Sequence, residues 1–284
     1  LTFYGLVPKV VLMDKDNDYK MRLEDVVKAY TPKTIALLIT NPANPSCKFI
    51  DEDELQKIVD FFFFYNIYIV YDAIFEEAPM FNNRRVQIFK MARDYKKLIK
   101  IKGFSKDIPQ LSDLRCGWTI CKDPNFINSL LELGEAVNYS NSTFLEALGI
   151  VEMTQRVNVD KGDKSPETLE YVREKEQYHG QVITLFNDAY KYLLTQTDVV
   201  ENVVYPDAGN IMYVTLRKDA CNIKGVMTSH ELFVHILENE NILVTPGNVF
   251  GLPLEDLSFR VTISRGYDQF MDGLRRIVEL FKEE

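Results

Sequence analysis

The 284-residue chain is long enough to bury a large core and to form one large domain or two smaller ones. Hydrophobic residues make up 46% of it and charged residues 26%, which is ordinary for a globular protein. Since 42 acidic and 33 basic residues give a net charge of −9 and no basic stripe offsets it, the sequence argues against binding to nucleic acid or to an anionic membrane.

Short apolar runs alternate with helical patterns over the first half of the chain. The strand-like runs are Val10–Met13, Thr34–Thr40, Ile67–Asp72 and Leu98–Gly103. Between them, Leu23–Tyr30 and Glu52–Phe64 have the apolar spacing of helices, and Asp51 with Glu54 resembles a capping box at the start of the second helix. The alternation predicts a parallel α/β sheet, whose ligands bind beyond the carboxyl ends of the strands.

The most apolar stretch of the chain is Phe61–Tyr71. It contains Asn66 and is much shorter than the roughly 20 apolar residues that a membrane span needs. We therefore interpret it as the end of a helix followed by a buried strand.

The second half has a different pattern. A long charged helix is expected over Ser165–Leu194, because Ser165-Pro166 is a typical start and acidic residues follow in the first turn. The elements expected after it are strands at Val199–Tyr205 and Ile211–Leu216, a helix at Ser229–Asn239, strands at Ile242–Val244 and Ser258–Ile263, and a terminal helix from Tyr267. This α+β succession predicts a smaller domain at 158–284 after a larger one at 1–157, with the boundary in the polar stretch 158–165.

Four cysteines are spread along the chain: Cys47, Cys116, Cys121 and Cys221. None forms a CxxC pair, which predicts reduced thiols in a cytoplasmic protein rather than a disulfide scaffold or a zinc site. His230 and His235 are five residues apart, so they do not share a helix face as an i, i+4 pair would. We therefore expect no metal site.

Polar side chains follow two of the predicted strands. Two Asn-Pro steps in the segment 41–45 force a rigid turn and leave Asn44 where a ligand would lie. Asp72 closes an almost wholly apolar strand, where a carboxylate is costly to bury without a cation such as a protonated ring nitrogen. Without a ligand, the same residues form an ordinary turn and a solvated strand end.

Three cationic residues have the chemistry of a cofactor and substrate site. Lys106 follows a predicted strand, and lysine is the residue whose desolvated amine forms imines. Arg115 comes nine residues later, and arginine grips phosphate in two places. Arg260 lies inside a strand-like run, where a substrate carboxylate or a structural ion pair would answer its charge. The common alternative for any one of these residues is a solvated surface charge.

In their order along the chain, these segments resemble the class I and II aminotransferases, which are fold-type I enzymes that use pyridoxal 5'-phosphate (PLP). The resemblance covers nearly all of the chain. Its motifs are N-P-x-N-P-[TS]-G at 41–47, the cofactor aspartate at Asp72, the lysine motif at 103–106 with L-R-x-G-W at 114–118, P-G-x-x-F-G at 246–251 and the late arginine at Arg260. The implied fold is a three-layer, mostly parallel sheet with helices on both faces, plus the smaller α+β domain.

The resemblance also implies a role for each residue. Lys106 would carry PLP as a Schiff base and act as the catalytic proton carrier. Asp72 would keep the ring nitrogen protonated, and Asn44 would donate to the ring O3′. The remaining contacts would be Ser105 and Arg115 on the phosphate, and Arg260 with Asn44 on the substrate carboxylate.

Three positions depart from the family pattern. Phe75 replaces a cofactor-binding tyrosine and removes one hydrogen bond to O3′. Gly103 replaces a serine that would contact the phosphate, and Cys47 replaces the glycine of the Asn-Pro turn. The resemblance further implies about a hundred residues before Leu1, including a phosphate loop, so we expect the natural protein to be longer.

The function expected from the resemblance is transfer of an amino group between an L-amino acid and a 2-oxo acid, by a homodimer with its sites at the interface. Two alternatives stay open. One is a PLP-dependent lyase, cyclase or decarboxylase of the same fold, and the other is an aminotransferase-like module without catalysis. The sequence does not predict which amino acid or oxo acid is used.

Overall fold

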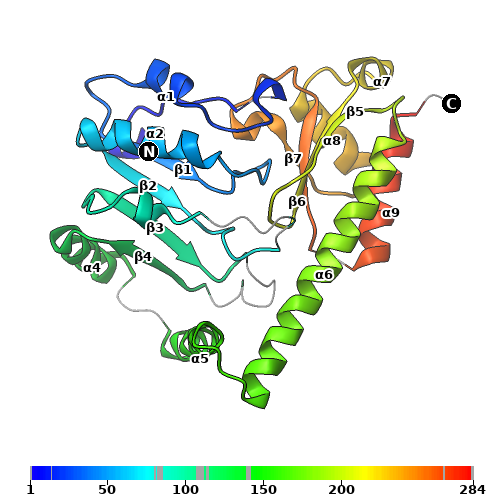
Figure 1. Ribbon diagram of the computed structural model, residues 1–284. Helices are drawn as coiled ribbons and strands as arrows, with labels where there is room; N and C mark the ends of the chain where they lie inside the picture. The colour runs from blue at the N-terminus through cyan, green and yellow to red at the C-terminus, as the bar shows by residue number, and fades with distance from the viewer. Residues whose placement is uncertain are drawn as a thin grey trace. The chain divides into compact units, whose positions relative to one another are not determined.

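The computed structural model describes residues 2–13, 15–79, 81, 86–106, 112, 115–138, 142–264 and 266–282. The chain forms two compact units, whose elements are labelled in Figure 1. Unit 1 comprises residues 1–30, 42–50 and 182–284, and unit 2 comprises residues 31–41 and 51–181. The division expected at residues 157 and 158 does not coincide with these units and stays a prediction about the domains.

Unit 2 contains a four-stranded sheet in the order β1-β2-β3-β4. Its strands are β1 (Ala36–Thr40), β2 (Tyr68–Asp72), β3 (Leu98–Gly103) and β4 (Gly117–Cys121). The first three are parallel, and β4 runs antiparallel to β3. The expected parallel α/β sheet is therefore confirmed, and the carboxyl ends of β1 and β2 meet where Thr40 lies opposite Asp72.

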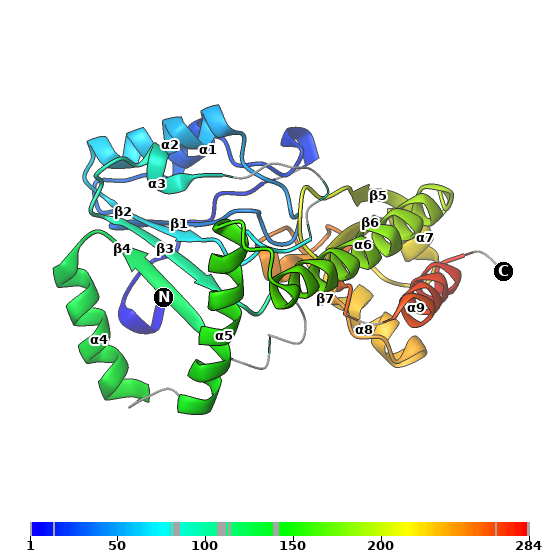
Figure 2. The same ribbon diagram turned by 60° about the horizontal axis from the view of Figure 1, so that its bottom comes forward.

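The helices of this unit follow from amphipathic segments. They are α2 (Glu52–Phe64), α3 (Ile88–Met91), α4 (Pro124–Asn138) and α5 (Thr143–Asp160), together with the first part of α6 (Pro166–Leu194). Helix α2 buries a stripe at i, i+3, i+4 and i+7, made of Leu55, Ile58, Val59 and Phe62. Helices α4 and α5 lie beside the β4 end of the sheet in both Figure 1 and Figure 2.

Unit 1 is built on an antiparallel sheet in the order β5-β6-β8-β7. Its strands are β5 (Val200–Val204), β6 (Ile211–Leu216), β7 (Thr245–Pro246) and β8 (Ser258–Thr262). Its helices are α1 (Leu23–Ala29), α7 (Lys218–Ile223), α8 (Ser229–Glu240), α9 (Tyr267–Leu280), the C-terminal part of α6, and short 3-10 turns at Thr2–Tyr4, Lys15–Asn17 and Gly247–Phe250. The expected α+β character of the C-terminal half is confirmed.

Helix α8 begins at Ser229, as predicted, because a capping box fixes its first turn. The side chain of Thr228 accepts a hydrogen bond from the Glu231 backbone N–H at 3.2 Å, and the Glu231 carboxylate accepts one from the Thr228 N–H at 2.9 Å. This reciprocal capping box satisfies two N–H groups that the helix leaves free. The box expected at Asp51 is wrong, because Asp51 precedes α2 without a side-chain cap bond.

Two strand predictions are wrong. Val10–Met13 is not a strand, and its side chains of Val10 and Leu12 are 63% and 46% exposed. The strand expected at Ile242–Val244 lies instead at Thr245–Pro246, the residues that pair with β8. In both cases the apolar pattern was present, but hydrogen bonds to a neighbouring strand decide where a strand forms.

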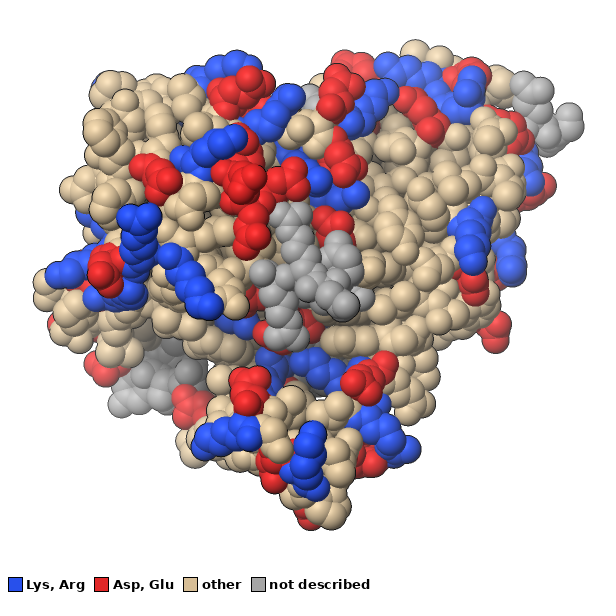
Figure 3. All heavy atoms as spheres, in the orientation of Figure 1, with Lys and Arg blue, Asp and Glu red and all other residues tan. Residues whose placement is uncertain are grey.

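Charges on the face drawn in Figure 3 are interspersed, with acidic and basic side chains alternating over both halves of the view. Within the described part of the chain, no helix is both long and apolar enough to cross a bilayer. The described residues also contain no group of three or more His, Cys, Asp or Glu side chains that could hold a metal ion.

Candidate functional site

Asp72 is the carboxylate at the carboxyl end of β2. Its side chain accepts a hydrogen bond from the Ile74 backbone N–H at 3.0 Å, and its carbonyl accepts one from the Asn41 N–H at 3.0 Å. Partial burial raises the pKa of the Asp72 carboxyl above its usual value, and the Ile74 bond offsets part of this rise. No lysine or arginine among the described residues forms an ion pair with it, so Asp72 is a strand-end carboxylate without a cationic partner in the described part of the chain.

Lys106 lies close to the loop that follows Asp72. Its Nζ is 5.9 Å from the centre of the Phe75 ring, and that ring is only 3% exposed. Ser105 and Lys106 are themselves partly exposed, directly after β3 and a short bend. The structure therefore places the Lys106 amine next to Phe75, which follows Asp72 by three residues, and a shared site of these residues stays a prediction.

Arg115 has no described contact with Asp72, Phe75 or Lys106. It is exposed and adopts a left-handed conformation with φ 48°, and its guanidinium donates to the Ser112 carbonyl at 3.3 Å. No described contact joins it to Lys106 or Asp72. Leu114, the first residue of its motif, lies outside the described residues, so the phosphate role of Arg115 stays a prediction.

The packing around Gly103 explains one departure from the family pattern. A Cβ at this position would lie 3.1 Å from the Cys116 carbonyl oxygen and 3.2 Å from Cδ1 of Ile74. Both distances are tighter than ordinary van der Waals contact, because β3 and β4 approach closely here. A serine at this position would force its neighbours to move.

Unit 1 holds the other two predicted residues, Asn44 and Arg260. The turn that carries Asn44 is closed by hydrogen bonds from the Cys47 N–H to the Ala43 carbonyl at 2.8 Å and from the Ala43 N–H to the Lys48 carbonyl at 2.9 Å. Cys47 is fully buried with φ 54°, a conformation that favours the glycine of the family pattern. Burial raises the pKa of its thiol to about 12, so Cys47 is a neutral packing residue.

Arg260 lies in the middle of β8, opposite Tyr213 on β6 and Thr245 on β7. Its Nη1 donates to Oδ1 of Asn44 at 3.1 Å, and its Nη2 donates to Oγ1 of Thr245 at 3.2 Å. The guanidinium carbon is 5.3 Å from the centre of the Phe250 ring. All of these partners are neutral.

The charge of Arg260 has no counter-charge in the described structure. Its Nε is buried without a hydrogen-bond partner, and no described Asp or Glu forms an ion pair with it. Burial lowers the pKa of the guanidinium, and no carboxylate offsets this. The sequence left two interpretations of Arg260. The structural ion pair is absent from the described residues, which leaves a substrate carboxylate as the candidate partner of this charge.

Thr245 and Phe250 were not predicted as site residues. Thr245 carries no signal in the sequence, because its contact depends on the pairing of β7 with β8. Phe250 belongs to the segment 246–251 that resembles a family motif, but nothing in that motif alone indicates a contact with an arginine.

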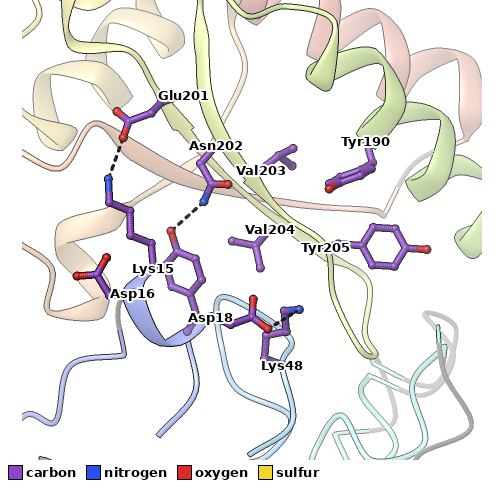
Figure 4. Close-up of a pocket in the computed structure, with 11 residues that line it drawn as sticks. Lys15, Asp16, Asp18, Lys48, Tyr190, Glu201, Asn202, Val203, Val204 and Tyr205 are labelled. Atoms are coloured by element: carbon purple, nitrogen blue, oxygen red, sulfur yellow. Dashed lines mark hydrogen bonds and ion pairs between the residues drawn. The ribbon is translucent and has the colours of Figure 1, made fainter.

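A cavity of about 570 Å³ lies elsewhere in unit 1 (Figure 4). Four of its charged side chains are paired with each other, Lys15 with Glu201 at 3.0 Å and Lys48 with Asp18 at 3.1 Å. None of the predicted site residues lines it.

Comparison with known proteins gives a consistent result. The family described as "Aminotransferase class I and II" matches residues 1–276. A probable aspartate/prephenate aminotransferase of Aquifex aeolicus is 24% identical over all of this chain and 66% of its own length, and an aspartate aminotransferase of Bacillus subtilis is 24% identical over 93% and 61%. The chain thus spans less than two thirds of the length of these relatives.

Solved structures share the fold. An aromatic aminotransferase from Pyrococcus horikoshii superposes with a TM-score of 0.75 at 19% identity, over 95% of this chain and 66% of the other. A PLP-bound aminotransferase, described as putative, from Clostridium difficile superposes with a TM-score of 0.78 at 16% identity, over 98% of this chain and 66% of the other. The α/β fold is therefore that of fold-type I aminotransferases, and the match over residues 1–276 shows that the chain belongs to the class I and II aminotransferase family.

Proposed function

We propose that the protein is a PLP-dependent aminotransferase that moves an amino group between an L-amino acid and a 2-oxo acid. The observation that carries this proposal is the guanidinium of Arg260, which is partly buried, bound to neutral partners and not paired with any described carboxylate. Such a group is built to receive a carboxylate, which both substrates of an aminotransferase carry. The similar proteins named above as aspartate/prephenate, aspartate and aromatic aminotransferases support the same reaction class.

The residues of unit 2 fit PLP. Asp72 is a carboxylate without a described cationic partner, which suits a protonated ring nitrogen. Lys106 presents its amine beside Phe75, which follows Asp72 by three residues. Lys106 would hold PLP covalently, Asn44 would donate to O3′, and Ser105 and Arg115 would hold the phosphate. When bound, PLP supplies the electron sink that stabilises negative charge at the substrate Cα.

The protein's own groups would bind the substrate and move its proton. Arg260 would bind the α-carboxylate through its guanidinium group. The Asn44 amide oxygen is already occupied by Arg260, so its NH₂ group is left to donate to the same ligand. The Lys106 amine would act as the proton carrier at the substrate Cα.

A half-reaction screen tests the proposal. Purified protein loaded with PLP is mixed with one amino acid at a time, without any oxo acid, and the amine form of the cofactor is quantified by mass spectrometry. At least one common amino acid should convert the cofactor stoichiometrically. If none does, the protein is not an aminotransferase, and an unchanged absorbance spectrum with every amino acid would favour a module without catalysis.

A second candidate is a PLP-dependent lyase, cyclase or decarboxylase. Phe75 favours it, because this buried side chain offers no hydroxyl to O3′ where the family pattern has a tyrosine. The two reactions differ in their need for a second substrate. Sustained turnover of an amino acid without a 2-oxo acid would support this candidate, whereas turnover that requires an oxo acid supports transamination.

We also propose that the protein is a homodimer in the cytoplasm. Apolar side chains are exposed along α4 and α5, among them Leu131 at 61%, Val137 at 71%, Phe144 at 70% and Ile150 at 66%. Such a surface supports an interface with a second copy. All four cysteines are free, as in a reducing compartment. Sedimentation should show a dimer, and Phe144→Glu with Ile150→Glu should yield a monomer; a wild-type monomer would contradict the proposal.

A further inference from the structure

The guanidinium of Arg260 is in contact with an aromatic ring. The Phe250 ring centre is 5.3 Å from the guanidinium carbon, within the range of a cation–π contact. Hydrogen bonds to Asn44 and Thr245 fix the two terminal nitrogens at the same time. The arginine is therefore held in one place before any ligand is bound.

Phe250 is itself fixed, because its 3-10 turn is anchored by buried hydroxyl groups. The Asn248 N–H donates to Oγ of Ser229 at 3.3 Å, and this hydroxyl donates back to Oδ1 of Asn248 at 3.1 Å. At the start of the turn, Gly247 packs against Ser258, whose hydroxyl lies 2.6 Å from the Tyr213 hydroxyl. Both serines have an exposed fraction of 0%.

A second ring supports the first. Tyr213 is 2% exposed and packs edge-on against Phe250, with ring centres 6.4 Å apart and an interplanar angle of 87°. Tyr213 also lies directly opposite Arg260 on the neighbouring strand. The sheet, the Tyr213 ring and the anchored turn thus set the position of the Phe250 face.

We infer that Phe250 is a positioning residue that orders Arg260 for a substrate carboxylate. This inference rests on the proposed function. An aromatic face attracts the cation without bringing a negative charge that would compete with the ligand. Ordering the long arginine side chain in advance removes part of the entropy loss of binding. An acidic side chain in the same place would order Arg260 equally well but would neutralise it.

The test compares Phe250→Leu with wild type. Leucine keeps an apolar side chain but lacks the aromatic face, so Arg260 should gain rotamer freedom. Immobilising one such side chain is worth about 0.5–1.5 kcal/mol, so KM for the amino acid and for the oxo acid should rise together by about two- to tenfold. The value of kcat should stay within about twofold, because this binding is lost equally from ground state and transition state.

The mobility of the Arg260 side chain can be measured without cofactor or substrate. The Nε–H resonance, assigned by its loss in Arg260→Lys, should be rigid in ¹⁵N relaxation of wild type and mobile in Phe250→Leu. Phe250→Tyr, which restores an aromatic face, should return both KM and rigidity toward wild type. Val249→Ala is the matched control, since Val249 is 64% exposed in the same turn.

The outcomes separate the inference from the proposed function. If wild type neither binds nor converts any carboxylate substrate, the proposed function fails, while the relaxation measurement still decides the role of Phe250. An equally rigid Arg260 in Phe250→Leu, or a fall in kcat with unchanged KM, would overturn the inference. If Phe250→Leu does not fold by circular dichroism, Phe250→Met serves as the ring-free variant with the same expected results.

Discussion

The amide oxygen of Asn44 accepts a hydrogen bond from Nη1 of Arg260 at 3.1 Å, although the two residues are 216 positions apart in the sequence. Because this oxygen faces the guanidinium, the NH₂ group of the Asn44 amide is left to donate to a carboxylate ligand. The pair therefore presents N–H donors from both side chains, which is suited to a carboxylate. The orientation of the amide is set by the arginine.

Asn44→Asp should weaken the binding of a carboxylate substrate to Asn44 and Arg260. The new carboxylate would form an ion pair with Arg260 and repel a substrate carboxylate at the same place. Like charges in close contact cost several kcal/mol, so KM or Kd for a carboxylate substrate should rise by about a hundredfold or more. Asn44→Ala adds no charge and should lose only about tenfold, the value of one hydrogen bond to a charged group. Equal losses in the two variants would contradict the argument.

Asp72→Asn should weaken PLP binding without lowering the stability of the unloaded protein. Partial burial raises the Asp72 pKa in the folded protein above the unfolded value of about 3.9. The folded state therefore binds more protons than the unfolded state between these two values, and its stability falls as pH rises through that window. Above this window the carboxylate is charged and disfavours the folded state when no cation is bound.

The unloaded Asp72→Asn protein should therefore be at least as stable as wild type at pH 7, with urea unfolding at pH 4 and pH 7 as the measurement. PLP affinity should fall by about a hundredfold or more, since removing one partner of a buried charge pair costs about 3–5 kcal/mol. A variant that is destabilised at pH 7 but binds PLP normally would show that Asp72 has a structural role.

Apolar periodicity located β1, β2, β3 and α2 to within about two residues, because buried strands and amphipathic helices carry their pattern in their own sequence. The same reasoning placed a strand at Val10–Met13, where the structure has none. A strand also needs a hydrogen-bonding partner, and partners are not visible in local sequence.

The candidate site was predictable only in part. Asn44 and Arg260 were singled out separately from motifs, and the structure joins them. Thr245 and Phe250 complete the same group through strand pairing and a 3-10 turn, so no local pattern identified them. Asp72, Phe75 and Lys106 follow the ends of two neighbouring parallel strands, and for this reason their proximity was predictable from the fold class.

Lys106→Ala should abolish the covalent attachment of PLP. Without the amine no imine forms, so borohydride reduction should leave no cofactor mass on the peptide that contains residue 106. Turnover should fall by at least about a hundredfold, since a positioned proton carrier typically contributes that much. Lys97→Ala is a suitable control, because Lys97 is a partly exposed lysine near the start of β3 whose amine binds the Asn66 carbonyl. Labelling of Lys106→Ala equal to wild type would exclude Lys106 as the attachment site.

Glu76→Ala should destabilise unit 2. The Glu76 carboxylate lies 2.7 Å from Nζ of Lys100 and 2.9 Å from Nζ of Lys102, and the three side chains are only 11–14% exposed. Without Glu76, Lys100 loses its carboxylate partner, whereas Lys102 keeps Glu77 at 3.3 Å. Removing one partner of a buried ion pair costs about 3–5 kcal/mol, because the other charge is left unpaired. In the exposed pair Glu170 and Arg173, Glu170→Ala should change the free energy of unfolding by less than about 1 kcal/mol. Similar values for the two variants in urea unfolding would refute this distinction.

Gly247→Ala should perturb the turn that holds Phe250. A Cβ at Gly247 would lie 2.1 Å from Oγ of Ser258 and 3.1 Å from the Tyr213 hydroxyl, and both groups are buried. Overpacking of this kind costs about 1–3 kcal/mol. Gly180→Ala is the control with the opposite expected sign. Gly180 lies within α6, and no atom lies within 4 Å of its Cβ position. Alanine should therefore stabilise the folded protein by about 0.5–1 kcal/mol.

Adding Ser258→Ala to Gly247→Ala removes the atom with the shortest contact, so the double variant should recover part of the lost stability. The contact with the Tyr213 hydroxyl remains, and recovery should therefore be incomplete. Since the turn positions Phe250, the single variant should also raise KM for carboxylate substrates in the direction expected for Phe250→Leu. If Gly247→Ala lowers stability while KM stays at the wild-type value, the turn can shift without moving Arg260, and the anchoring of Phe250 would not be needed to order the arginine.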